Sequence, residues 1–126
     1  MGPINVLVVD DDKLTRWSVA TILGRLGYQV SEGVSFEEGA AALEQRLPEL
    51  VLLDIRLPDS DGFALLEIIR QRHPNLPVLM MTAHPSPETV QRALDLGAAG
   101  HLNKPIKSAE LKRAVSGALE SARSKR

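Results

Sequence analysis

The fold is decided by the stretch Glu49-Leu-Val-Leu-Leu-Asp54-Ile-Arg56-Leu-Pro58-Asp59-Ser-Asp61-Gly62. The four apolar residues after Glu49 predict a short strand that is buried on both faces. Pro48 bounds this strand on one side, and the Pro, Asp and Gly residues that follow predict a turn. Asp54 stands at the carboxyl end of the strand, where a carboxylate can face a crevice instead of an apolar core. We therefore expect Asp54 to belong to a site.

Length and composition limit the classes of protein to consider. The chain has 126 residues, 44% of them hydrophobic and 25% charged, which is typical of one globular domain. A formal net charge of -1 argues against direct contact with nucleic acid by this segment, since Lys and Arg are not in excess. The absence of cysteine excludes disulfides and thiolate metal ligands. Without a signal pattern or an apolar run near the roughly 20 residues that cross a bilayer, we expect a cytoplasmic protein with no membrane contact.

Three other short apolar segments also end in polar residues. The first two are mainly apolar runs that predict buried strands, and the third is short and predicts a minimal strand. The segments and the polar residues after them are 4–9 with Asp10, Asp11 and Asp12; 77–81 with Thr82; and 100–102 with Lys104. A further segment, 28–32, alternates only weakly and is predicted to be an edge strand.

Helices are predicted between the strands and after the last one. Their expected ranges are 13–26, 35–47, 63–72, 86–97 and a final helix that opens at Ser108. Asp12 is predicted to cap the first helix, and Ser35 with Glu38 predicts a capping box at the second. Trp17 lies off the apolar stripe of the first helix, so it either covers the flank of that helix or contacts a partner. The basic end of the chain predicts a domain over residues 1–121, followed by a tail or the start of a linker over 122–126.

The alternation of strands and helices predicts the fold class. Short connections favour an α/β fold, with a single-domain, doubly wound, five-stranded parallel sheet covered by helices on both faces. The flavodoxin-like order 2-1-3-4-5 opens a crevice at the carboxyl ends of strands 1 and 3. In a parallel sheet, the polar residues that follow the strands emerge along one edge. Oxygen ligands without His or Cys favour Mg²⁺, and a carboxylate beside an ammonium and a hydroxyl suits phosphoryl transfer to Asp54.

Taken together, the motifs resemble the receiver domains of two-component response regulators. The matching motifs are Val-Val-Asp10-Asp11-Asp12, Leu-Leu-Asp54-Ile-Arg-Leu-Pro58-Asp-Ser-Asp-Gly62, Met-Thr82-Ala83 and Lys104-Pro105. The segment from Asp12 to Trp17 is also similar to receivers of the nitrogen-regulator type, the sigma-54 activators. Those receivers precede an ATPase module and a DNA-binding module, so the resemblance implies an output domain in the same chain.

The resemblance implies a phosphoryl acceptor and a metal site. A sensor histidine kinase or a phosphotransfer protein would phosphorylate Asp54 in a Mg²⁺-dependent reaction. Asp11 and Asp54 would bind the ion directly, Asp10 would lie nearby or act through water, and the backbone carbonyl of Arg56 would complete the set. Such a domain is not an enzyme in the usual sense, because it catalyses only its own phosphotransfer and slow autodephosphorylation.

The resemblance also implies a switch. Thr82 and Lys104 correspond to the residues that hold the phosphoryl group, and their movement reshapes the face formed by helix 86–97, strand 100–102 and the last helix. A phosphorylation-dependent homodimer and control of transcription are expected to follow. His101 occupies the position of an aromatic switch residue, where it is either a surface histidine or a working switch. Arg56 and His84 are predicted to tune the lifetime of the phosphorylated state.

Two alternatives remain open. A non-phosphorylated pseudo-receiver would act only as an interaction module, and it would be expected to have lost Asp54, Asp11 or Lys104. A phosphatase of the haloacid-dehalogenase type also begins with a strand and an Asp-x-Asp motif, which Asp10 and Asp12 satisfy. Such an enzyme needs a longer chain and a further acidic pair on a later strand, where this sequence has Lys104.

Overall fold

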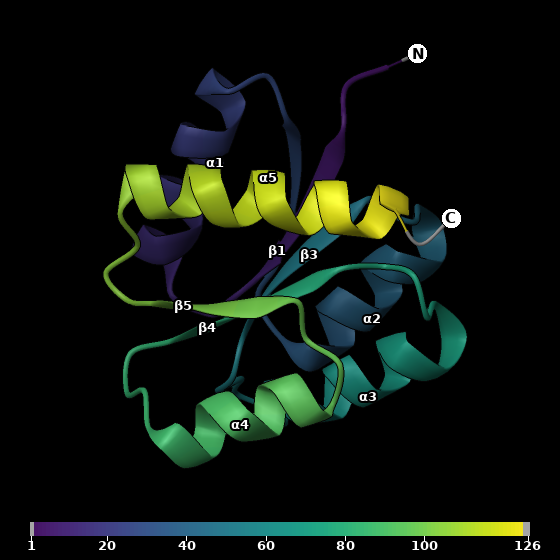
Figure 1. Ribbon diagram of the computed structural model, residues 1–126, viewed down its shortest axis with the longest axis vertical. Helices are drawn as coiled ribbons and strands as arrows, with labels where there is room; N and C mark the ends of the chain where they lie inside the picture. Colours follow the sequence, from purple (N-terminus) through teal and green to yellow (C-terminus); the bar gives the residue numbers. More distant parts are fainter. Residues whose placement is uncertain (1, 125–126) are drawn as a thin grey trace.

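The computed structural model describes residues 2–124, which alternate between strands and helices along the whole length (Figure 1). The strands are β1 (Asn5–Val9), β2 (Gln29–Gly33), β3 (Leu50–Asp54), β4 (Val78–Thr82) and β5 (Gly100–Asn103). The helices are α1 (Lys13–Arg25), α2 (Phe36–Gln45), α3 (Gly62–Arg72), α4 (Pro87–Asp95) and α5 (Ser108–Ser124). None of the helices among residues 2–124 combines the length and the apolar character that a membrane crossing requires.

The strands form one parallel sheet in the predicted order, β2-β1-β3-β4-β5. Its register aligns the carboxyl ends of the strands. Val9 of β1 lies beside Leu53 of β3, and Asp54 at the end of β3 lies beside Met81 of β4. The polar residues that follow these strands therefore meet at one edge of the sheet, and the predicted fold class is confirmed.

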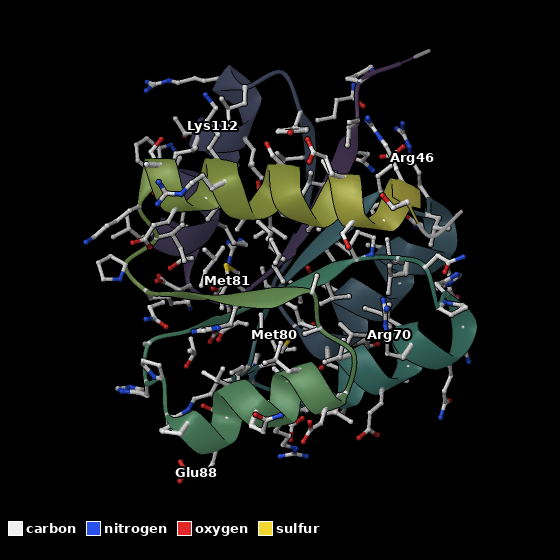
Figure 2. All side chains as sticks on the ribbon, viewed as in Figure 1. Arg46, Arg70, Met80, Met81, Glu88 and Lys112 are labelled. Atoms are coloured by element: carbon white, nitrogen blue, oxygen red, sulfur yellow. The ribbon has the colours of Figure 1, made fainter. Side chains whose placement is uncertain are left out.

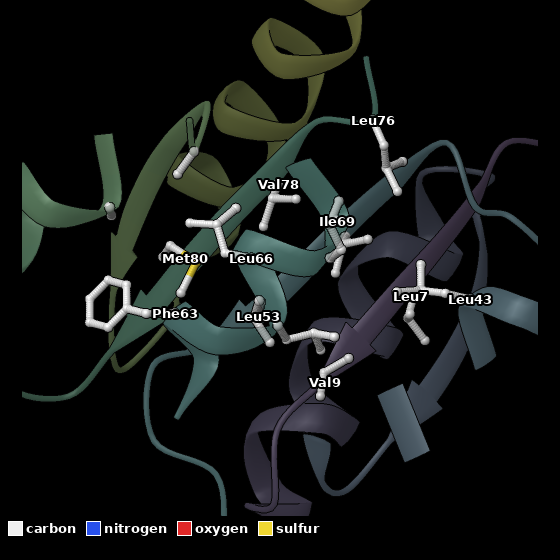
Figure 3. Close-up of a cluster of buried hydrophobic side chains, with 14 residues drawn as sticks. Leu7, Val9, Leu43, Leu53, Phe63, Leu66, Ile69, Leu76, Val78 and Met80 are labelled. Carbon is white, nitrogen blue, oxygen red and sulfur yellow. The ribbon is translucent and has the colours of Figure 1, made fainter. Parts of the chain in front are cut away.

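Helices cover both faces of the sheet, with α1 and α5 on one side and α2, α3 and α4 on the other (Figure 1). Because successive strand residues point to opposite faces, the buried side chains divide into two cores. Met80 points toward the α4 side and its neighbour Met81 toward the α5 side (Figure 2). Figure 3 shows the core on the α3 side, where Leu66 and Ile69 of α3 pack with Val78 of β4.

Side chains cap the helices where backbone N–H groups lack a partner within the helix. Asp12 accepts a hydrogen bond from the backbone N–H of Leu14 at 3.1 Å, which confirms its predicted role as the cap of α1. At α2, Ser35 accepts from the backbone N–H of Glu38 at 3.1 Å, but the Glu38 carboxylate accepts from Val34 instead of Ser35. The predicted capping box is thus half wrong, because the Glu38 side chain extends one residue beyond the cap.

The last helix is longer than expected. The polar end of the sequence predicted that ordered structure stops near residue 121, whereas α5 continues to Ser124. Ala118 and Ala122 lie one helical turn apart and are both buried, so the inner face of α5 extends into the segment predicted to be a tail. The predicted tail residues 125 and 126 lie outside the described residues, and the domain boundary itself stays a prediction.

Candidate functional site

The polar residues predicted to form a site converge at the carboxyl edge of the sheet. A cavity of about 310 Å³ opens there, beside the ends of β3, β4 and β5. Its lining residues are Asp11, Asp54, Arg56, Leu57, Pro58, Thr82, Ala83, His84 and Lys104. Parallel strands deliver their carboxyl ends to one edge, which explains how residues so far apart in sequence come together.

The Lys104 ammonium lies between two carboxylates. Its Nζ atom is 2.9 Å from Asp54 Oδ2 and 2.6 Å from Asp10 Oδ2. Asp10 is fully buried and Asp54 is 6% exposed, so water screens these charges weakly. The backbone N–H of Lys104 donates to the carbonyl oxygen of Thr82 at 2.8 Å, which ties the end of β5 to the end of β4. One cation therefore serves two buried anions.

Burial shifts the pKa values of this cluster. Burial raises the pKa of Asp10 to about 6, and the negative charge of Asp54 adds to the rise, although Lys104 partly offsets it. For Lys104, burial alone would lower the pKa, but contact with Asp10 and Asp54 outweighs it and leaves the pKa raised. Lys104 thus remains a cation at neutral pH, while ionised Asp10 is held at a cost in free energy.

The carboxylates of Asp10, Asp11 and Asp54 are grouped closely enough to hold one ion. One oxygen from each lies within 4.8 Å of the others. The Oδ2 atom of Asp10 is buried and lies 2.6 Å from the Lys104 ammonium, which Asp54 shares, so one cation balances only part of the negative charge. A set of hard oxygen donors with spare capacity fits Mg²⁺. Arg56 lines the same cavity, and its backbone N–H donates to Asp54 Oδ1 at 3.2 Å.

Thr82 places a hydroxyl beside the carboxylates. It is 6% exposed, and its Oγ1 atom accepts a hydrogen bond from the backbone N–H of His84 at 3.0 Å. A hydroxyl that accepts this bond keeps its own proton for donation. The cavity therefore presents the carboxylate of Asp54, the ammonium of Lys104 and the hydroxyl of Thr82 to a bound ligand. His84 and Arg56 also line this cavity.

His101 lies elsewhere. It pairs with Met80 in the register of β4 and β5, is half-buried, and lines a separate hollow of about 390 Å³ with Glu110 and Arg113 of α5. The structure thus does not bring His101 into the cavity of Asp54. Its role as a switch stays a prediction.

Two supporting residues were missed from the sequence. Arg16 donates from Nη1 to the carbonyl oxygen of Asp10 at 2.8 Å, and its Nε atom lies 3.1 Å from a carboxylate oxygen of Glu32. Strand β2 thus also serves this edge, because its Glu32 orients the arginine that holds the end of β1. Nothing local signals this pair, since 16 residues separate its members.

Trp17 of α1 lies close to the site but outside it. The residue is 64% exposed, and it lines a neighbouring surface cavity of about 510 Å³ together with Leu14, Pro105 and Ile106. Most of the tryptophan is therefore not covered by its own helix.

Comparison with known proteins shows the family of this chain. The sequence profile of the family described as "Response regulator receiver domain" matches residues 6–116. The DNA-binding transcriptional regulator NtrC of Salmonella typhimurium is 43% identical over 101 residues, which are 80% of this chain and 22% of that protein. The response regulator protein PilR of Pseudomonas aeruginosa is 37% identical over 119 residues, 94% of this chain and 27% of that protein. This chain thus spans only about a quarter of these relatives.

Solved structures show the same fold. The receiver domain of NtrX from Brucella abortus superposes with a TM-score of 0.87 at 40% identity, covering 91% of this chain and 98% of that one. A CheY-like receiver domain protein from Methanospirillum hungatei superposes with a TM-score of 0.93 at 30% identity, covering 99% of this chain and 100% of that one. The chain belongs to the receiver domain family of two-component response regulators, with relatives of the NtrC type.

Proposed function

We propose that this chain is a phosphorylation-activated signalling switch in which Asp54 accepts the phosphoryl group. One observation carries the proposal: Asp54, Lys104 and Thr82 line a single cavity at the ends of three strands. Asp54 stands beside the only lysine among the lining residues, at 2.9 Å from its Nζ atom. A receiver domain is a regulatory domain and not a dedicated enzyme, so this cavity would serve one modification instead of substrate turnover.

The donor would be a phosphohistidine on a sensor histidine kinase or a phosphotransfer protein. A carboxylate oxygen of Asp54 attacks phosphorus, so that a P–O bond forms while the P–N bond to the donor imidazole breaks and its electron pair stays on nitrogen. Lys104 balances negative charge on the phosphoryl oxygens, and the Thr82 hydroxyl donates a hydrogen bond to one of them. A bound Mg²⁺ would neutralise further charge on these oxygens.

The carboxylates of Asp10, Asp11 and Asp54 and the backbone carbonyl of Arg56 would hold that Mg²⁺. The fit rests on the oxygens within 4.8 Å of one another and on the excess of negative charge that remains because Asp10 and Asp54 share one ammonium. A divalent cation beside Asp10 would also offset the repulsion from Asp54 that contributes to its raised pKa.

The output would pass through the face formed by α4, β5 and α5. Lys104 follows β5 and bonds to Thr82 through its backbone, so a new partner for its ammonium would shift both strand ends together. His101, which lies on β5, would act as the switch residue of this face. We expect a phosphorylation-dependent homodimer and an output domain in the same chain, because NtrC and PilR are far longer than this segment. Control of transcription would place such a protein in the cytoplasm.

The proposal is tested with acetyl phosphate as a small donor, and with beryllofluoride as a phosphate mimic, each with and without Mg²⁺. After treatment with acetyl phosphate, intact mass should show one added phosphoryl group on the wild type with Mg²⁺ and none on Asp54→Asn. An unmodified wild type would instead support a pseudo-receiver that acts as an interaction module, and steady release of product from an added phosphomonoester would support a phosphatase.

The same preparation tests the roles of Arg56 and His84. Both line the cavity of Asp54, where water would approach the acyl phosphate. The variants Arg56→Ala and His84→Ala should change the half-life of phosphorylated Asp54 with little effect on folding. Half-lives equal to that of the wild type would remove both residues from the proposed set.

A further inference from the structure

The connection between β3 and α3 is a closed loop. Arg56 and Asp61 pair as an antiparallel bridge, and the backbone N–H of Leu57 donates to the carbonyl oxygen of Ser60 at 3.1 Å. Arg56, Leu57 and Pro58 on the outgoing side of this loop line the cavity of Asp54. The shape of the loop therefore decides where the backbone of Arg56 lies relative to that cavity.

The base of this loop is packed tightly against β3. The backbone N–H of Gly62 donates to the carbonyl oxygen of Ile55 at 2.6 Å. A Cβ atom added to Gly62 would overlap the carbonyl oxygen of Asp54, so only glycine fits at this position. The base is thus fixed by backbone contacts, and the tip is the part of the loop that a side chain has to hold.

Asp59 holds the tip. Its Oδ1 atom accepts from the backbone N–H of Phe36 at 2.9 Å, and its Oδ2 atom accepts from Glu37 at 3.1 Å. Phe36 and Glu37 are the first two residues of α2, and their N–H groups have no partner within the helix. Asp59 therefore acts as a second cap of α2, supplied from another part of the chain in addition to Ser35.

The bond pattern suits an ionised carboxylate. Hydrogen bonds from Phe36 and Glu37 lower the pKa of Asp59 below its usual value. The start of a helix also carries a partial positive charge, which attracts an anion. The contact thus joins the loop to α2 by charge as well as by hydrogen-bond geometry.

We propose that Asp59 is a positioning residue for the metal site, which it serves by anchoring the loop that presents the backbone carbonyl of Arg56. The inference rests on the proposed function, because it assumes that Arg56 contributes to Mg²⁺ binding. Asp59 does not touch the cavity itself, since it is absent from the residues that line it. The Arg56 carbonyl belongs to the peptide unit that leads into Leu57, so its direction depends on the tip as well as on the bridge to Asp61. Without the anchor, the tip is released and this carbonyl points to the metal site for only part of the time.

The test compares Mg²⁺ binding by calorimetry in the wild type, Asp59→Ala and Ser35→Ala. Ser35→Ala is the matched control, because it removes the other cap of α2, the bond to Glu38 at 3.1 Å, and leaves the loop untouched. Asp59→Ala should raise the Mg²⁺ dissociation constant about tenfold, as is typical when a residue that orients a metal ligand is lost. Asp59→Asn, which keeps one acceptor oxygen, should lose less. Ser35→Ala should bind as the wild type does.

Two results would overturn the inference. The first is an unchanged dissociation constant in Asp59→Ala, and the second is an equal loss in Asp59→Ala and Ser35→Ala, which would mean that only the stability of α2 matters. Far-ultraviolet circular dichroism confirms that each variant is folded. A wild type that binds no Mg²⁺ would overturn the proposed metal site together with this inference, whereas a wild type that binds Mg²⁺ leaves the two separable.

A second readout follows from the reciprocity of coupled binding. If Mg²⁺ binding orders the loop, it also strengthens the contact of Asp59 with α2. Adding Mg²⁺ should slow hydrogen exchange at the amides of Phe36 and Glu37 in the wild type and not in Asp59→Ala. If Mg²⁺ does not change the exchange rates of these amides in the wild type, Mg²⁺ binding is not coupled to the contact of Asp59 with α2.

Discussion

The two edges of the sheet treat buried polar groups differently. At the amino edge, Asn5 is 4% exposed, and its side-chain oxygen accepts from the Ser31 hydroxyl at 3.3 Å. The backbone N–H of Asn5 donates to a carboxylate oxygen of Glu49 at 2.6 Å. The backbone N–H of Asn5 and the hydroxyl of Ser31 each meet an acceptor, so these two bonds stabilise the start of β1.

At the carboxyl edge the pairing is unequal. Asp10 and Asp54 share one ammonium, and a third carboxylate, that of Asp11, lies within 4.8 Å. This excess of negative charge raises the free energy of the folded chain. It lies at the place where the proposed chemistry needs a metal cation and a phosphoryl group. Of these two clusters, the one with matched hydrogen bonds holds the start of a strand, while the one with an excess of negative charge lies at the proposed site.

Removing the shared cation should have the largest effect. Lys104→Met leaves two buried carboxylates facing each other, and we expect the free energy of unfolding at pH 8 to fall by about 3 kcal/mol. The loss should be smaller at pH 5, because Asp10 then takes up a proton. Urea unfolding at the two pH values measures the difference. A loss of unfolding free energy that is the same at pH 5 and pH 8 would show that excess negative charge does not set the cost at the carboxyl edge. The two edges would then not differ in charge balance.

Removing one carboxylate should have the opposite sign. The pKa of Asp10 is about 6 in the folded chain and 3.8 ordinarily, so its contribution to stability is fully present below pH 3.8 and is lost as the pH rises through 6. Without Mg²⁺ at pH 7.5, Asp10→Asn should therefore be more stable than the wild type, by at most about 3 kcal/mol, since the pKa is raised from 3.8 to about 6 and each pKa unit is worth about 1.4 kcal/mol. The variant should also lose stabilisation by added Mg²⁺.

Urea unfolding with a chelator present, repeated from pH 4 to pH 8, checks this prediction. The stability curve of the wild type should fall across the interval relative to that of Asp10→Asn. A variant that is less stable than the wild type at pH 7.5 would show that the ion pair with Lys104 outweighs the cost of burial.

The amino edge should give the smallest effect. Asn5→Ala removes a matched hydrogen bond, so we expect a loss of about 1 kcal/mol that does not depend on pH between 5 and 8. Stabilisation by Mg²⁺ should be unchanged, because Asn5 lies at the opposite edge from the site. Thermal unfolding with and without Mg²⁺ provides the measurement. A change in the Mg²⁺ response would break the division between the two edges.

The sequence was sufficient for the parts of the molecule that depend on local pattern and on parallel geometry. Apolar runs located the strands, and a parallel sheet sends their ends to one edge, so the meeting of Asp54, Thr82 and Lys104 followed from topology. Asp12 was distinguished from Asp10 and Asp11 because a helix start needs only one cap. Strand order also agreed with prediction, since right-handed crossovers leave few alternatives.

The remainder depends on contacts between distant segments. The bonds of Asp59 to α2 and of Arg16 to Glu32 join positions that no local pattern relates. The end of α5 was placed too early because its outer face is polar, while Ala122 on its inner face is too small to give a strong apolar signal. His101 was assigned by the position it occupies in the motif, and it is not among the residues that line the cavity of Asp54.

The consecutive methionines of β4 have a consequence for how this site can change. Because Met80 and Met81 belong to opposite cores, slipping the strand by one residue would exchange them and disrupt both layers at once. The position of Thr82 relative to Asp54 is thus fixed by the close packing of the two apolar cores. It does not depend on any polar contact at the carboxyl edge of the sheet. The polar residues at the carboxyl edge supply the reactive groups, and the apolar core residues align the strands that carry them. The reactive groups can therefore be replaced by others without loss of strand alignment.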